Sequence, residues 1–144
     1  MAKVIIFSGA GISAESGIST FRGSDGLWNN HKIEDICTAG CLDTNRDMTI
    51  AFYNERRTTL KNNEPNHAHK VVAKLKSKYP NEIAVITQNV DDMFERAGCD
   101  DVIHLHGFLT NLRCEKCGSI KHIGYINQND NERCELCGST MRPD

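Results

Sequence analysis

The sequence predicts an α/β fold, in which helices pack on a partial parallel sheet, followed by a small cysteine-rich module. Short apolar runs typical of buried strands occur at 4–7, 84–87 and 102–106, and stretches with helical periodicity lie between them. Strands that alternate with helices favour a parallel sheet, because each parallel connection crosses over through a helix. From residue 114 two Cys-x-x-Cys pairs flank a polar linker, which indicates a separate unit.

The first half of the chain is predicted to contain one strand and its helices. Strand 4–7 runs into a glycine turn, and a helix is expected to begin near Ser13. The segment 18–43 has several glycines and no clean period, so we interpret it as loop with short helices. Helices are predicted over 47–60 and 66–78, because apolar residues recur there at helical spacing.

The next elements repeat the strand–helix alternation. Strand 84–87 is followed by a predicted helix over 91–97 that stops at Gly98. The third strand, 102–106, ends at Gly107. The predicted sheet therefore has three strands, and its far edge is expected to expose apolar surface.

Length, composition and charge exclude several classes of protein. The chain has 144 residues, 39% of them hydrophobic, and a formal net charge of −2. This length suits one domain with a small insert. Because there is no global basic field and no run of 18 apolar residues, we expect no nucleic acid and no membrane as partner. The apolar run at 4–7 is too short for a signal peptide, which predicts a cytoplasmic protein.

The glycine turn has the form G-x-G-x-x-A over residues 9–14. It follows a strand and precedes a helix, where the first glycine permits a tight turn and the second lets a pyrophosphate approach the backbone. The motif alone is weak, and a glycine turn without a ligand is the alternative. The acidic residue expected about 20 positions later in dehydrogenases is not evident, since Asp25 is too close.

Four motifs, in the same order, resemble those of the sirtuins, a family of NAD-dependent protein-lysine deacylases. They are the segment 9–18 with Thr20-Phe21-Arg22-Gly23, then Thr87-Gln88-Asn89-Val90-Asp91, then His104-Leu105-His106-Gly107, and last the paired cysteines. The resemblance implies an NAD site. The residues it assigns to cofactor binding are Gly9, Ala10, Gly11, Ile12, Ser13, Glu15, Thr20, Phe21, Arg22, Trp28, Gln88, Asn89 and Asp91.

The resemblance also implies a reaction. In sirtuins the oxygen of an acyl-lysine attacks the ribose carbon that carries nicotinamide, a histidine acts as general base, and the acyl group passes to the ribose. The products are nicotinamide, free lysine and O-acyl-ADP-ribose. His106 is the candidate base, because imidazole titrates near neutral pH. His104 lies two positions earlier on the same predicted strand face, so spacing does not choose between them. The family pattern, histidine directly before glycine, selects His106.

Asn89 and Asp91 follow the strand next to that of His106, so we expect them in the same crevice. An amide and a carboxylate there are suited to ribose hydroxyls and the nicotinamide amide, although both residues are also common helix caps. In the family, Phe21 and Arg22 lie on a loop that covers the cofactor. The arginine is expected to meet phosphate, and the phenyl ring to shield the reactive ribose from water.

The cysteine pairs predict a structural zinc site. Cys114, Cys117, Cys134 and Cys137 form two Cys-x-x-Cys turns, each followed by glycine, with 16 residues between them. Four thiolates satisfy tetrahedral Zn²⁺ and leave no position open for substrate. Unmetallated thiols are the alternative. The remaining cysteines, Cys37, Cys41 and Cys99, are interpreted as buried or incidental.

Tyr53 and Arg56 lie three positions apart on a predicted helix and so share a face. They resemble the tyrosine–arginine pair of sirtuins that remove succinyl and malonyl groups, in which the arginine holds the distal carboxylate. By spacing alone Arg57 serves equally well, and solvated arginines on an amphipathic helix are the alternative. Cys37 stands where those relatives carry alanine, so both desuccinylation and deacetylation stay open.

The resemblance extends over nearly the whole chain, which stops where sirtuins return from the zinc module to the sheet. The full prediction is a partial Rossmann-like parallel sheet with helices over 1–112 and an inserted zinc ribbon over 113–142. Acyl-lysine proteins are the expected partners, and another chain is a candidate to complete the sheet. Alternative functions are a catalytically incomplete zinc-containing binding or assembly module, and an NAD hydrolase or ADP-ribosyltransferase. A nucleic-acid-binding zinc ribbon is a weaker alternative, because the basic residues near the cysteines are few.

Overall fold

The computed structural model describes residues 3–20, 27–28, 31–32 and 40–144. The roles predicted for Phe21, Arg22 and Cys37 therefore concern residues outside the described part, and of Trp28 only the backbone is described. The chain divides into two compact units. The sheet unit comprises Met1–Thr20 and Asn63–Phe108, and the cysteine unit comprises Phe21–Asn62 and Leu109–Asp144. The predicted boundary between residues 112 and 113 stays a prediction.

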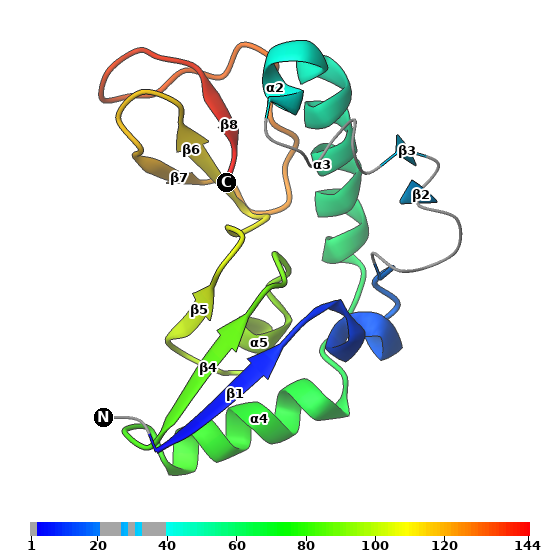
Figure 1. Ribbon diagram of the computed structural model, residues 1–144, viewed down its shortest axis with the longest axis vertical. Coiled ribbons are helices and arrows are strands. Elements are labelled where there is room, and N and C mark those ends of the chain that lie inside the picture. The colour runs from blue at the N-terminus through cyan, green and yellow to red at the C-terminus, as the bar shows by residue number, and fades with distance from the viewer. Residues whose placement is uncertain (1–2, 21–26, 29–30, 33–39) are drawn as a thin grey trace. The chain divides into compact units, whose positions relative to one another are not determined.

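The sheet unit contains the predicted parallel sheet (Figure 1). Its strands are β1 (Val4–Ser8), β4 (Ile83–Thr87) and β5 (Val102–His104), in the order β1-β4-β5. Both pairs are parallel. The helices of this unit are the 3-10 helix η1 (Ala10–Ser16) and the α-helices α4 (His67–Lys78) and α5 (Met93–Arg96). The predicted α/β fold is confirmed.

One face of the sheet carries the core of this unit. Val85 lies at the centre of β4 and is paired with Ile6 and Val102 on its two neighbours. Side chains from α4, α5 and the following turn close the core, which comprises the buried residues Ala73, Ile83, Val85, Phe94 and Cys99. Because side chains alternate between the faces of a strand, all three central residues point into this core.

The opposite face of the sheet is apolar and exposed. Ile5 and Phe7 on β1 are 62% and 59% exposed, and Ile103 on β5 is 51% exposed. These residues are out of phase with Ile6 and Val102, as the alternation of a strand requires. Parallel sheets are normally covered on both faces, so this bare face is unusual.

The cysteine unit is built on an antiparallel sheet of β6 (Asn111–Cys114), β7 (Ile120–His122) and β8 (Met141–Pro143), in the order β7-β6-β8. Its apolar centre is Leu112, Cys114, Cys134 and Met141. The unit also contains α2 (Cys41–Thr44), the long helix α3 (Arg46–Lys61), and the antiparallel pair β2 (Leu27–Trp28) and β3 (His31–Lys32).

Polar contacts attach α3 to the antiparallel sheet and its loops. Arg46 donates to Glu115 Oε1 at 2.8 Å and to the Met141 carbonyl at 2.9 Å. At the middle of the helix, the Asn54 side chain pairs with both backbone groups of Gln128, donating at 3.0 Å and accepting at 2.8 Å. These hydrogen bonds add to the burial of Ile50, Phe52 and Leu60, the apolar side chains of the same helix.

Several predicted element boundaries are wrong. The strand expected over 102–106 ends at His104, because the chain turns there and Gly107 adopts a positive φ of 90°. The helix expected near Ser13 is a 3-10 helix that Gly17 ends in the left-handed conformation. The segment 18–43, interpreted as loop with short helices, also contains the strands β2 and β3.

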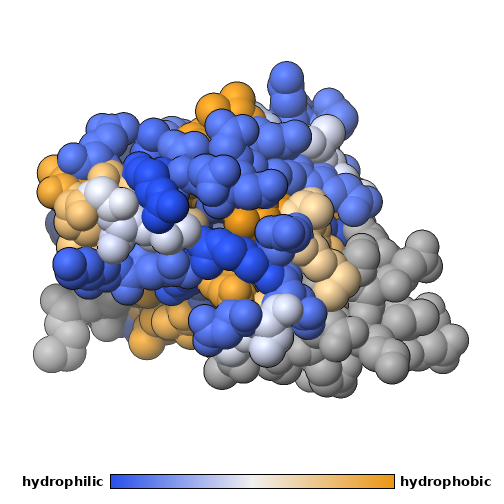
Figure 2. Space-filling view, turned by 90° about the horizontal axis from the view of Figure 1, so that it is seen from above, coloured by the Kyte–Doolittle hydropathy of each residue, from blue (hydrophilic) through white to orange (hydrophobic). Residues whose placement is uncertain are grey.

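The visible surface in the view from above is mainly hydrophilic, with hydrophobic residues in small groups between the polar ones (Figure 2). Among the described residues, no helix is both long and apolar enough to cross a membrane.

Candidate functional site

A buried polar cluster lies where β1 and β4 end. Ser13 comes from η1, which follows β1, and Asn89 and Asp91 come from the loop that follows β4. His69, from the first turn of α4, completes the cluster. All four side chains are buried, Ser13 and His69 completely. The structure thus brings Ser13, Asn89 and Asp91 together at the carboxyl ends of two strands.

Ser13 is the centre of the hydrogen bonds in this cluster. Its hydroxyl donates to Asp91 Oδ2 at 2.8 Å and accepts from Asn89 Nδ2 at 3.1 Å. His69 Nδ1 accepts the backbone N–H of Asn66, which places the imidazole proton on Nε2, 3.4 Å from Ser13 Oγ. The hydroxyl therefore donates once and accepts twice, which is its full capacity.

His69 is neutral in this arrangement. Burial lowers its pKa, an effect that the nearby charge of Asp91 only partly offsets. The ring also lies edge-on to Phe94, with 5.0 Å between ring centroids. Sequence reasoning missed His69. The available signal was Asn66, which caps α4 and forms a capping box with His69.

The backbone after β4 is held from both sides. The Asn89 N–H donates to Thr87 Oγ1 at 3.0 Å, and the Asn89 carbonyl accepts from His104 Nδ1 at 2.7 Å. Asp91 Oδ1 accepts the N–H of Met93 at 3.2 Å, so the alternative of a capping role applies to one of its two oxygens. Asn89 and Asp91 are therefore rigidly positioned side chains with lone pairs left for a ligand.

The glycine turn offers open backbone. A Cβ at Gly11 would meet nothing within 4 Å, whereas one at Gly9 would lie 3.5 Å from Gln88 Oε1. Gly9 thus packs closely against the start of the loop after β4, and Gly11 borders free space that is compatible with an approaching phosphate. Of the other predicted cofactor residues, Ile12 packs against the sheet core. Among the remaining predicted cofactor residues that the structure describes, Glu15 and Gln88 are exposed, and Ala10 and Thr20 are partly buried.

The structure distinguishes His104 from His106, between which residue spacing does not choose. His106 is exposed in the turn after β5 and is accessible to a reacting group. His104 is partly buried, and both its ring nitrogens are engaged, by the Asn89 carbonyl and by Glu95 Oε1 at 2.8 Å. The expectation that both lie on one strand face is wrong, because β5 ends at His104.

The predicted acyl-binding pair lies in the cysteine unit, on α3. Arg56 is buried, with its guanidinium 5.9 Å from the centre of the Phe52 ring, and Tyr53 meets the same ring edge-on. Arg57 is completely buried and donates to the Leu109 carbonyl at 2.7 Å and to Asn54 Oδ1 at 2.8 Å. Burial lowers the pKa of Arg57 to about 10. Arg57 is thus a structural residue, and the alternative of solvated arginines is wrong for both positions.

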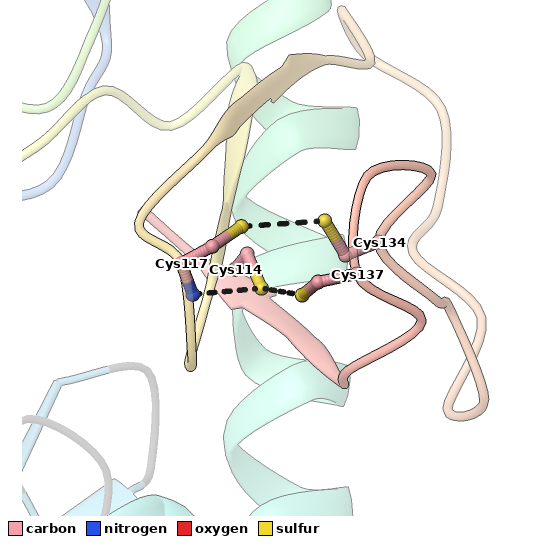
Figure 3. Close-up of side chains that lie close together, drawn as sticks. All are labelled: Cys114, Cys117, Cys134 and Cys137. Carbon is pink, nitrogen blue, oxygen red and sulfur yellow. Dashed lines mark hydrogen bonds between the residues drawn. The ribbon is translucent and has the colours of Figure 1, made fainter.

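The four paired cysteines converge (Figure 3). Their sulfur atoms all lie within 4.8 Å of one another, with 3.5 Å between Cys114 and Cys137 and 3.6 Å between Cys117 and Cys134. Tetrahedral zinc with sulfur ligands at about 2.3 Å requires about 3.8 Å between sulfurs, so the arrangement fits this ion.

The two cysteine turns share one geometry. In each, the glycine N–H bonds to the carbonyl of the first cysteine, at 3.1 Å for Gly118 and 2.8 Å for Gly138. Both glycines have a φ of 71°, which only glycine adopts readily. A hydrogen bond with the Ser119 hydroxyl lowers the pKa of Cys134 to about 6, whereas hydrogen bonds with the neighbouring thiols raise the pKa of Cys137 to about 11. Four ligands leave no open position, so the site is structural in type.

The family is identified by comparison with known proteins. The Sir2 family model matches residues 9–144. An NAD-dependent protein deacylase from Campylobacter jejuni is 50% identical over 139 residues, which cover 96% of this chain and 59% of that protein.

Two solved structures are similar in fold as well as sequence. A Sir2 homologue in complex with NAD matches with a TM-score of 0.81 at 39% identity, covering 97% of this chain and 54% of that one. Sir2 bound to acetylated peptide matches with a TM-score of 0.75 at 30% identity, covering 97% of this chain and 56% of that one. The chain spans between half and two thirds of the length of these relatives. Since the family model matches almost every residue, this chain belongs to the Sir2 family.

Proposed function

We propose that this chain carries the cofactor and catalytic residues of an NAD-dependent protein-lysine deacylase. The observation that carries the proposal is the buried Ser13–Asn89–Asp91 cluster at the carboxyl ends of two parallel strands, where open α/β sheets bind ligands. The proposal is also supported by the Campylobacter jejuni relative, which is named an NAD-dependent protein deacylase. A similar Sir2 homologue is solved with NAD, and Sir2 is solved with acetylated peptide.

The described residues suit the roles that such a reaction requires. NAD, when bound, supplies a ribose that loses nicotinamide and receives the acyl group. Asn89 and Asp91 would hold polar groups of the cofactor, and their orientations are fixed because Ser13 binds both side chains and the Met93 N–H binds Asp91. His106, exposed after the neighbouring strand, removes a proton from a ribose hydroxyl. Gly11 gives a phosphate access to the backbone.

The direct test is nicotinamide release from NAD by the purified chain, with and without acetyl-lysine and succinyl-lysine peptides. We expect peptide-dependent release that His106→Ala abolishes and that His122→Ala, a change at another exposed histidine, leaves intact. Release without peptide would instead support NAD hydrolysis or ADP-ribosyl transfer. No NAD binding by a folded, zinc-loaded protein would reject the proposal in favour of a zinc-containing binding module.

We further propose that Tyr53 and Arg56 recognise an acyl group that ends in a carboxylate. The support is chemical, since a guanidinium holds a carboxylate through charge-assisted hydrogen bonds, and Tyr53 and Arg56 meet the same Phe52 ring. Arg56→Met should remove activity on succinyl-lysine and spare activity on acetyl-lysine. Lys61→Met, an exposed cation later on the same helix, is the matched control. Equal losses on both peptides would reject the carboxylate clamp.

We also propose that the exposed face of the sheet binds a second polypeptide that supplies helices for it. The support is physical, since Ile5, Phe7 and Ile103 leave apolar area in water on a parallel sheet. The occupant we favour corresponds to the part of the Campylobacter jejuni relative that this chain does not cover. The match covers 59% of that protein, so this part is the other 41% of its length. Co-expression with that segment should yield a complex and reduce binding of an apolar dye. Dye binding that stays unchanged would reject this partner.

A further inference from the structure

His104 is the one titratable residue of the third sequence motif to which the proposed reaction gives no role. Both of its ring nitrogens face acceptor oxygens. Nδ1 lies 2.7 Å from the backbone carbonyl of Asn89, and Nε2 lies 2.8 Å from Glu95 Oε1. The side chain is only 11% exposed, so water does not replace either contact.

This geometry selects a protonation state. A neutral imidazole carries one N–H and one lone pair, whereas a carbonyl oxygen only accepts hydrogen bonds. If His104 were neutral, either the Asn89 carbonyl or the Glu95 carboxylate would face a lone pair at less than 3 Å. The imidazolium, with two N–H groups, satisfies both contacts together.

The surroundings of His104 support its charge. Burial opposes the charged form, but the hydrogen bonds to Glu95 and Asn89 and the charges of Glu95 and Asp91 outweigh it, so the pKa of His104 is raised. Glu95 comes from α5 and Asp91 from the loop after β4. The second oxygen of Glu95 is buried without a hydrogen-bond partner among the described residues, which makes His104 the hydrogen-bond partner of this carboxylate. On the remaining side, Phe108 contributes an uncharged ring at 4.6 Å.

We propose that His104 is a pH-dependent positioning residue for the cofactor site. As an imidazolium, His104 fixes the Asn89 carbonyl, and it loosens this carbonyl when it loses a proton. The connection is direct, because the Asn89 carbonyl binds His104 while the Asn89 side chain binds Ser13. The Asn89 N–H, which belongs to the preceding peptide unit, is fixed separately by Thr87, so loss of the His104 contact frees only the peptide unit between Asn89 and Val90. The consequence of this pH-dependent contact for catalysis rests on the proposed function, whereas the contact between His104 and Asn89 does not.

The test is an NMR titration of the full, zinc-loaded chain with labelled histidine, from pH 5.5 to 9. We expect His104 to titrate with a midpoint above the ordinary 6.5, and the amide resonances of Asn89 and Val90 to follow with the same midpoint. Glu95→Gln should lower that midpoint for both. His104→Gln should abolish the pH dependence at Asn89, and His67→Gln, at an exposed histidine of α4, should leave it unchanged.

Two results would overturn the proposal. One is a His104 that titrates at or below 6.5 in the wild-type chain, or whose nitrogen shifts show that Glu95 holds the proton. The other is an Asn89 peptide that does not respond while His104 titrates. Neither measurement needs NAD or turnover. A parallel NAD titration therefore separates the two ideas, since absent binding rejects the proposed function and leaves the titration result standing.

Discussion

Asn54→Ala is expected to destabilise the cysteine unit by about 3 kcal/mol. The side chain makes three hydrogen bonds, two to the backbone of Gln128 and one from Arg57 Nη1. Each of the two neutral hydrogen bonds to Gln128 contributes about 1 kcal/mol net, and the hydrogen bond from the charged Arg57 contributes about 2 kcal/mol. The three bonds together contribute about 4 kcal/mol. Because Asn54 is only partly buried, water recovers some of this.

Thermal unfolding, followed by circular dichroism at fixed zinc concentration, measures the effect of this change. For a chain of this length, about 3 kcal/mol corresponds to a fall in Tm of about 10 °C. The matched control is Glu55→Ala, the exposed neighbour on the same helix, which should change Tm by no more than about 2 °C. If Asn54→Ala behaves like this control, the contact between α3 and the Gln128 segment is not what holds the helix.

Three further predictions concern the polar cluster and the cysteines. Ser13→Ala should lower the free energy of unfolding by about 3 kcal/mol, because it leaves three buried polar side chains without their shared partner. The control Ser77→Ala, at an exposed serine, should leave the free energy of unfolding unchanged. A loss below about 1 kcal/mol for Ser13→Ala in chemical denaturation would contradict the hydrogen-bond network. Metal analysis should find one zinc per chain. Cys134→Ser should lose this zinc and Cys41→Ser should retain it. A full zinc content in Cys134→Ser would refute the ligand set. Stability should also fall as the pH drops below about 6.5, because the pKa of buried His69 is lowered in the folded state and unfolding then takes up a proton. His69→Gln should flatten this acid limb, and an unchanged limb would assign it to other groups. The contribution of His104 has the opposite sign, since its pKa is raised: it is complete below 6.5 and is lost as the pH rises through the folded value.

The types and order of the main elements were predictable from local pattern. Strands such as β4 are buried apolar runs, and α4 has apolar residues at helical spacing, although its buried residues are His69 and Ala73 while Val71 and Leu75 are exposed. The zinc ligands were predictable for a similar reason, because Cys-x-x-Cys turns place both sulfurs by local geometry alone. Boundaries failed where a single turn decided them, as at His104 and Gly107.

The composition of the polar cluster was only partly accessible. Ser13, Asn89 and Asp91 belong to motifs, but His69 reaches them from a helix 56 residues after Ser13. No spacing rule connects these segments, and only the packing of α4 against the sheet brings them together. The same holds for Arg56 and Arg57, which are equivalent by spacing. Arg57 became structural because the Leu109 carbonyl and Asn54 lie within reach of its guanidinium.

The sequence by itself determined the family, the parallel α/β architecture and the chemical types of residue at the site, because these follow from short-range patterns. Only the tertiary structure decided which histidine is exposed and which is held between Asn89 and Glu95. It also decided that Ser13 links the ends of two strands. The physical reason is that burial and hydrogen bonding depend on neighbours that are distant in the chain, and these neighbours set both the charge and the orientation of a side chain.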